Sequence, residues 1–221
     1  MSPEIINQLV DATALTLYMV AVAALIGTAL GLPLGVFLAT SRAGEIFAAP
    51  LTNRVIGTVV NATRSTPFII LVVAIIPFTR LIAGTSIGTT AAIVPLTIAA
   101  TPFIARIIES AVREVDPGLI EAARAMGATP FQIVRKVLVP EARPSIVLGL
   151  TLSVVSLIGH SAMVGAVGGG GLGDLGIRYG YQRFMPEVML AVVVILIVLV
   201  QTVQSAGDAL ARRLDRRARR S

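Results

Sequence analysis

The segment Gly159-His160-Ser161-Ala162 places the single histidine of the chain beside a serine, the two side chains that build many nucleophilic sites. Such a site needs the base within hydrogen-bond reach of the hydroxyl, but adjacent residues on a helix do not face each other. The chain also has no cysteine, so thiolate metal ligands are absent, and one histidine cannot form a histidine cluster. We therefore expect no catalytic residue, no metal site and no cofactor in this chain.

His160, Ser161 and Met163 lie in a long apolar run, where polar side chains are costly unless they face a cavity or a partner. Two interpretations stay open for these residues. They line or gate a translocation pathway, in which Met163 supplies a soft and adaptable closure. Alternatively, they form a hydrogen-bonded packing contact inside a helix bundle.

Gly168, Gly170 and Gly173 formally match the G-x-G-x-x-G pattern of dinucleotide sites. The match carries no nucleotide chemistry, because it follows an apolar helix instead of a strand and no Lys-Ser/Thr pair completes a phosphate loop. We expect a flexible external loop that includes Asp174 and Arg183. This loop either contacts a partner protein or simply connects two helices.

A polar insert, about residues 116–140, interrupts the apolar sequence with regular helix signals. Asp116 and Pro117 are typical of a helix start, and Gly127 is well placed to end that helix after Met126. Thr129, Pro130 and Gln132 indicate a second start, and Pro140 is expected to stop the second helix near Val139. The pattern predicts two short helices joined by an elbow at Gly127-Ala128. Helices this short need a surface to pack against, so the insert is either a knob for a cytoplasmic partner or an amphipathic segment at the lipid interface.

The insert resembles the EAA loop of binding-protein-dependent ABC importer permeases, whose pattern is E-A-A-x3-G-x9-I-x-L-P. The matching residues are Glu121-Ala122-Ala123, Gly127 and Val137-Leu138-Val139-Pro140, with valine replacing isoleucine and leucine at the two variable apolar positions. The resemblance implies that the two helices insert into a groove on an ATPase subunit. It implies this coupling role for Glu121, Ala122, Ala123, Gly127 and Pro140.

Three further stretches, "RSTPFIILVVAIIPFTR", "AAIVPLTIAATPFIAR" and "HSAMVGAVGGGGLGDLG", are similar to methionine importer permeases within that family. The resemblance covers about residues 15–208. It implies an importer of an amino acid, methionine, in the bacterial cytoplasmic (inner) membrane. The implied partners are two copies of an ABC ATPase that binds the ATP, a second copy of this chain and an extracytoplasmic substrate-binding protein.

The elements that carry these motifs are membrane helices. The chain of 221 residues is 55% hydrophobic and only 14% charged, with apolar runs long enough to cross a bilayer. We predict an all-α integral membrane protein, with residues 1–221 forming a single transmembrane permease domain. Its five predicted spans are Leu15–Leu38, Val55–Leu81, Ile87–Ala105, Ile146–Val167 and Val188–Ala206, with the two coupling helices between the third and the fourth.

The distribution of arginine and lysine predicts the orientation. With the N-terminus outside and the C-terminus inside, 15 of the 18 basic residues fall on the inner side, and Arg80, Arg178 and Arg183 remain outside. This arrangement explains the formal charge of +6 without nucleic acid. The arginine-rich tail, Arg212 to Arg220, is expected to attract anionic membrane lipid.

Small residues and prolines predict how the helices pack and bend. Gly27, Gly31 and Gly35 form a repeated small-xxx-small pattern that lets a neighbouring helix approach closely. Pro67 lies inside the second predicted span and is a possible hinge where that helix kinks.

Two other function classes remain as alternatives. A stand-alone secondary carrier or channel would need charge-relay residues within its helices, and the sequence offers few. A membrane scaffold would recruit a cytoplasmic protein through the polar insert without any transport.

Overall fold

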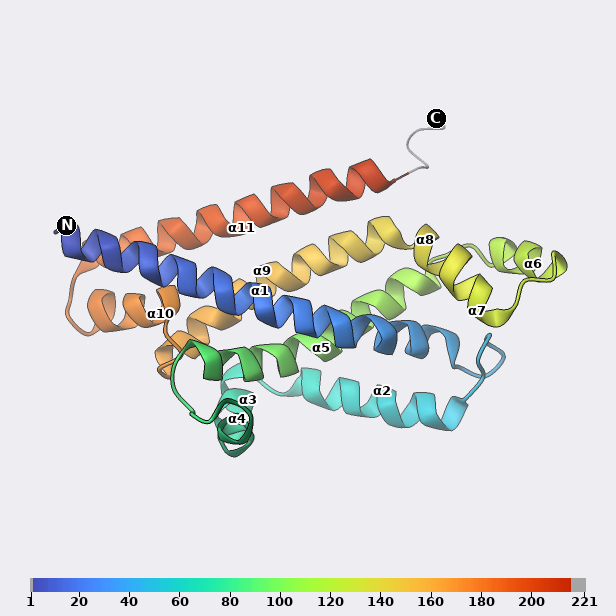
Figure 1. Cartoon of the computed structure of the whole chain (residues 1–221), viewed down its shortest axis with the longest axis horizontal. Coiled ribbons are helices and arrows are strands. Elements are labelled where there is room, and N and C mark those ends of the chain that lie inside the picture. Colours follow the sequence, from blue (N-terminus) through green and yellow to red (C-terminus); the bar gives the residue numbers. More distant parts are fainter. Residues whose placement is uncertain (1, 216–221) are drawn as a thin grey trace.

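The computed structural model describes residues 2–215, and every regular element within them is a helix (Figure 1). The part of the predicted tail from Arg216 to Arg220 lies outside the described residues. The helices, with the labels of Figure 1 and with η1 and η2 marking π-helical segments, are α1 (Pro3–Thr40), α2 (Pro50–Ser65), α3 (Phe68–Ala74), α4 (Ile76–Ala83), α5 (Thr89–Arg113), α6 (Pro117–Ala125), α7 (Pro130–Ile133), η1 (Val134–Leu138), α8 (Val139–Glu141), α9 (Arg143–Ala166), α10 (Gly171–Leu175), η2 (Gly176–Tyr181) and α11 (Pro186–Leu214).

Four helices in the described part of the chain are long and apolar enough to cross a membrane, and a bent fifth span is possible. The four are α1, α5, α9 and α11, which correspond to the first, third, fourth and fifth predicted spans. Each helix is longer than its predicted span, although α5 begins two residues later and α9 ends one residue earlier than predicted. The extension is largest at the start of α1, where Leu9 and Ala12 pack with α10 and α11 in a second apolar cluster.

The prediction that Val55–Leu81 forms one kinked helix is wrong. The structure breaks this region into α2, α3 and α4, and α2 meets α3 at an angle of 103°. The break occurs at Thr66, whose φ of −82° and ψ of 125° are extended. Pro67 explains this conformation, because a proline disfavours the helical conformation of the residue before it. Pro67 therefore ends α2 completely instead of bending a continuous helix.

The glycine pattern of α1 lets a neighbouring helix approach closely, as the sequence predicts, and the structure identifies that helix as α5. A Cβ atom on Gly31 would lie 2.9 Å from the carbonyl oxygen of Thr101, and one on Gly35 would lie 2.5 Å from that of Ala105. Such distances leave no room for a side chain, so glycine lets the two backbones approach. These contacts make α1 and α5 a closely packed pair at the centre of the bundle (Figure 1).

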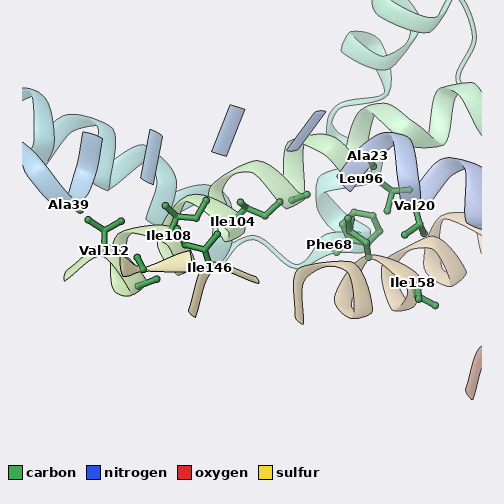
Figure 2. Close-up of a cluster of buried hydrophobic side chains, with 14 of the residues drawn as sticks. Val20, Ala23, Ala39, Phe68, Leu96, Ile104, Ile108, Val112, Ile146 and Ile158 are labelled. Carbon is green, nitrogen blue, oxygen red and sulfur yellow. The ribbon is translucent and has the colours of Figure 1, made fainter. Parts of the chain in front are cut away.

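The main apolar core follows this helix pair over much of its length. Figure 2 shows its labelled side chains in two groups, one near the end of α5 and one beside α3. The first group contains Ala39, Ile104, Ile108, Val112 and Ile146, and the second contains Val20, Ala23, Phe68, Leu96 and Ile158. The core thus joins α1, α5 and α9 and holds the broken region against them.

The segment expected to be a flexible external loop is folded. After a turn with positive φ at Gly168 and Gly170, it forms α10 and the π-helical segment η2. Leu172 and Leu175 are buried against α1 and α11, and this burial explains the order. The sequence predicted a loop here because the segment is rich in glycine, a residue typical of turns.

The two ends of the bundle differ in what they carry. Figure 1 shows the N-terminus and α10 at one end, and α6, α7 and the end of α11 at the other. Because α1 runs away from the N-terminal end and α5 runs toward α6, the polar insert lies at the same end as the described C-terminal part of the chain.

Candidate functional site

The polar insert forms a compact knob, residues 116–141, whose first helix starts and ends as its sequence predicts. The Asp116 carboxylate accepts a hydrogen bond from the Gly118 backbone N–H at 2.7 Å, and Pro117 occupies the first turn of α6. At the other end, the Gly127 N–H donates to the Arg124 carbonyl and the Ala128 N–H donates to the Ala123 carbonyl. This pair of bonds is the Schellman motif, and Gly127 supplies its left-handed residue with a φ of 78°.

The second part of the knob starts with the predicted capping box. Thr129 accepts a hydrogen bond from the Gln132 backbone N–H, and the Gln132 side chain accepts one from the Thr129 N–H. The prediction that the helix stops near Val139 is wrong. It passes through Pro140 by widening into η1, and the Val139 N–H reaches back five residues to the Val134 carbonyl. A π-helical turn is a recognised way to accommodate an interruption in the α-helical bond pattern.

The knob has a buried face and an exposed apolar face. Ala123, Ile133 and Leu138 are buried and join the main core. On the outside, Leu119 is 41% exposed, Phe131 is 64% exposed and Met126 is 82% exposed. We call these three residues the apolar tip. Large exposed apolar side chains at one end of a folded unit are typical of a surface that a partner covers.

The five residues implied by the EAA resemblance occupy different places in the knob. Glu121, Ala122 and Gly127 are exposed, Ala123 is buried, and Pro140 is half-buried beside η1. Glu121 also lines a hollow of ≈ 300 Å³ between α6, the end of α5 and the connection from α1 to α2. The knob is therefore fixed to the bundle through Ala123 and leaves Glu121 accessible.

A buried ion-pair cluster, the Glu109 junction, lies in the last two turns of α5. The Glu109 side chain is only 5% exposed, and its carboxylate pairs with Arg106, with Arg42 at 2.8 Å and with Arg113 at 3.8 Å. Arg106 also donates to the Gly57 carbonyl of α2 at 2.9 Å. The junction therefore ties α5 to α2 and to the residues that follow α1, close to the start of the knob.

Sequence reasoning missed the Glu109 junction. The third span was expected to end at Ala105, so these residues were assigned to a loop. Arg106, Glu109 and Arg113 recur at spacings of three and four residues, which is the pattern of ion pairs along one helix face. That spacing could have indicated that the helix continues. The partner in Arg42 is not readable from spacing, because it lies far away in the sequence.

A second hollow, which we call the membrane cavity, lies beside the break between α2 and α3. It has a volume of ≈ 350 Å³ and is bounded by α2, α3, α5 and α9. His160 lines it, with its imidazole stacked on the Phe68 ring at a centroid distance of 4.3 Å. Arg64 also lines it, with its guanidinium 5.8 Å from the centroid of the Phe103 ring.

The structure separates the residues that the sequence grouped as a candidate pathway. Ser161 is buried, and its hydroxyl donates to the Ile158 carbonyl at 2.7 Å, as in a packing contact. Met163 is 49% exposed and is not among the residues that line the membrane cavity. His160 faces that cavity, and Pro67 forms the adjacent break. Across residues 2–215, no three histidine, aspartate or glutamate side chains gather as a metal ion would require.

Comparison with known proteins gives a consistent picture. A family model described as "Binding-protein-dependent transport system inner membrane component" matches residues 31–220. The probable D-methionine transport system permease protein MetI of Vibrio cholerae is 59% identical over 209 residues, which cover 95% of this chain and 93% of that protein. The corresponding protein of Pasteurella multocida is 47% identical, over 98% of this chain and all of that protein.

The fold also matches a solved structure. A chain of the MetNI methionine ABC transporter, in an inward-facing conformation, superposes with a TM-score of 0.96. It is 52% identical and covers 98% of this chain and 100% of its own length. The similarity therefore extends over the knob and the membrane cavity as well as over the long helices.

Proposed function

Because the chain belongs to the family of binding-protein-dependent transport system inner membrane components, we propose that it is the permease subunit of an ATP-driven importer. High identity to D-methionine permeases, over nearly the whole chain, supports methionine as the transported amino acid. The permease lies in the bacterial inner membrane. ATP is bound and hydrolysed by a separate ATPase subunit, and this chain holds no cofactor of its own.

The exposed apolar tip of the knob is the observation that carries this proposal. Leu119, Met126 and Phe131 project from two capped helices that are anchored by buried side chains. A rigid, apolar and compact end is suited to enter a groove on a partner. We assign this role to the knob: α6 and α7 are the coupling helices, with Glu121, Ala122, Ala123, Gly127 and Pro140 forming or supporting the surface that meets the ATPase.

The attachment of the knob explains how it transmits motion. α5 ends at Arg113 and α6 begins at Pro117, while α8 ends at Glu141 and α9 begins at Arg143. The knob is therefore continuous with two membrane helices through very short connections. Displacement of the knob by closure of the ATPase pair moves α5 and α9 as stiff levers, in the manner of rigid-body switching.

Charge and position together support the proposed orientation. The knob and the end of α11 share one end of the bundle, and this end carries most of the basic residues. The positive-inside rule favours a cytoplasmic location for that end, with the N-terminus outside. Two copies of the chain then enclose one pathway above two ATPase subunits, and a substrate-binding protein delivers methionine from outside.

The proposal is tested at Gly127, where a β-branched residue cannot adopt the left-handed conformation without strain. We expect Gly127→Val to prevent co-purification of the ATPase and to abolish uptake in proteoliposomes, while membrane insertion persists. Gly84→Val is the matched control, because Gly84 also ends a helix with a positive φ and open space around it, but lies outside the knob. Normal ATPase binding by Gly127→Val would contradict the coupling role, and uptake without any ATPase would indicate a stand-alone carrier.

A further inference from the structure

Arg64 lies about midway along the length of the bundle. It is in the last turn of α2, and at 1.5 Å per residue it is about 21 Å along the helix from Pro50. Figure 1 shows that α2 starts at the knob end and finishes near the middle of the bundle. In the membrane this position corresponds to the hydrocarbon region, where a guanidinium is costly unless an anion or water compensates it.

No carboxylate compensates Arg64 in the described part of the chain. Its guanidinium contacts the face of the Phe103 ring, whereas the carboxylate of Glu109 is taken by Arg42, Arg106 and Arg113. Arg64 is also exposed to the membrane cavity that it lines. A guanidinium presents a fork of N–H donors that matches a carboxylate, so an anionic group of a ligand fits this position.

Two threonine hydroxyls of the cavity are arranged to accept hydrogen bonds. The Thr63 hydroxyl donates to the Val59 carbonyl at 3.0 Å, and the Thr66 hydroxyl donates to the Ala62 carbonyl at 3.2 Å. Since both protons are used within the chain, the oxygen lone pairs are left for an outside donor. Such oxygens, at the C-terminal end of α2 with its partial negative charge, suit an ammonium group.

Beside these polar groups and the serines Ser153 and Ser156, the cavity has an apolar and aromatic wall. This wall is formed by Phe68, Leu71, Ala99, Ala100, Phe103 and Leu157, and the stacking of Phe68 on His160 fixes the aromatic part. An unbranched apolar chain can lie along this wall, and a thioether sulfur gains from contact with an aromatic ring. The cavity volume of ≈ 350 Å³ admits a small amino acid.

We propose that the membrane cavity is a binding site for a zwitterionic amino acid with an unbranched apolar side chain, and that Arg64 holds its carboxylate. Thr63 and Thr66 accept from the ammonium group, and the aromatic wall receives the side chain. The inference rests on the proposed importer function and adds to it a substrate site within the membrane helices, separate from the external binding protein.

The test measures equilibrium binding of radiolabelled methionine to the purified permease–ATPase complex without binding protein. The ATPase alone is measured in parallel, so that methionine bound to that subunit is subtracted. We expect saturable binding that norleucine competes for and that methioninol, which lacks the carboxylate, does not. Arg64→Gln should weaken binding by about 10- to 100-fold, the effect of losing a hydrogen bond to a charged group.

Two variants sharpen the test. Arg64→Lys keeps the charge without the planar fork and should bind with intermediate affinity. Arg54→Gln removes an exposed arginine from the first turns of the same helix and should bind as the wild type does. The inference is overturned if the wild-type complex shows no saturable binding above the ATPase, if methioninol competes as well as norleucine, or if Arg64→Gln binds methionine normally.

The outcomes separate this inference from the proposed function. The methioninol comparison uses the wild-type complex, so it does not depend on the folding of a variant. If the wild-type complex takes up methionine in proteoliposomes but Arg64→Gln binds methionine normally, the importer function stands and only the proposed site is removed. A complex that takes up no methionine when ATP and binding protein are supplied removes the function itself.

Discussion

The two ends of the helix bundle are joined by different physical means. At the N-terminal end, α10 is clasped between α1 and α9 by glycines, and we call this the glycine junction: Thr16, Ala162, Gly165, Gly171, Leu172 and Gly173. At the knob end, the Glu109 junction joins α5 to Arg42, which follows α1, through an ion pair, and to α2 through the hydrogen bond from Arg106 to the Gly57 carbonyl. Close backbone packing has essentially one arrangement, whereas guanidinium groups on flexible stems can exchange partners. We infer from this comparison that the ion-paired contacts of Glu109 can rearrange at the knob end, whereas the glycine junction holds one arrangement.

Gly173→Val tests the glycine junction and should cause the largest loss of stability. A Cβ on Gly173 would collide with the backbone of Ala162, which cannot move aside. We expect a loss of about 4 kcal/mol or more in stability, seen as aggregation or absence of a folded peak in detergent. Gly159→Ala is the control, since a Cβ there meets open space. A folded and active Gly173→Val protein would show that the glycine junction is not tightly packed.

Glu109→Gln should have the next largest effect. It leaves three guanidiniums around a neutral amide, and removing one partner of a buried ion pair destabilises strongly. Because Arg42 and Arg113 are partly exposed, we expect a smaller loss of about 2 kcal/mol, together with fewer methionine molecules imported per ATP hydrolysed. The matched variant is Asp174→Asn, which removes an exposed pair with Arg178 and should cost about 0.5 kcal/mol or less. Equal effects of the two variants would refute a special role for the Glu109 junction.

Thr16→Val tests the one side-chain hydrogen bond named for the glycine junction and should cause the smallest loss of stability of the three variants. The Thr16 hydroxyl accepts a hydrogen bond from the buried Leu172 N–H at 2.9 Å, and valine leaves that N–H unsatisfied. We expect a loss of about 1–2 kcal/mol in unfolding free energy. Thr16→Ser keeps the acceptor and should retain most of the stability. If serine and valine were equally destabilising, packing of the methyl group would outweigh the hydrogen bond.

The two helix starts and the elbow of the knob could be predicted from the sequence, since their signals are local. Asp116-Pro117, Gly127 and the Thr129–Gln132 pair each act on backbone groups within three or four residues. The long helices were also predictable, because about 20 apolar residues cross a bilayer regardless of their neighbours. The glycine spacing of α1 likewise predicted a close helix contact, although not that α5 would make it.

Other parts of the site depend on contacts that spacing does not reveal. A proline indicates an interruption, but neither the complete break at Thr66-Pro67 nor the passage through Pro140 can be chosen without the surrounding helices. The Glu109 junction needs Arg42 from a distant segment, and the membrane cavity needs His160 of α9 beside Arg64 of α2. These features depend on contacts between segments that are distant in the sequence, and the spacing of residues within one segment does not reveal such contacts.

The π-helical segment η1 sets where the apolar tip points. A turn of this kind holds one residue more than an α-helical turn, and in an α-helix each residue corresponds to about 100° of rotation. Deleting one residue from Val134–Leu138 would let the segment relax to ordinary helix while swinging Met126 and Phe131 around the axis. The number of residues between Thr129 and Arg143 therefore sets the direction of the apolar tip: inserting or deleting one residue there would keep a regular helix but turn the tip to another side.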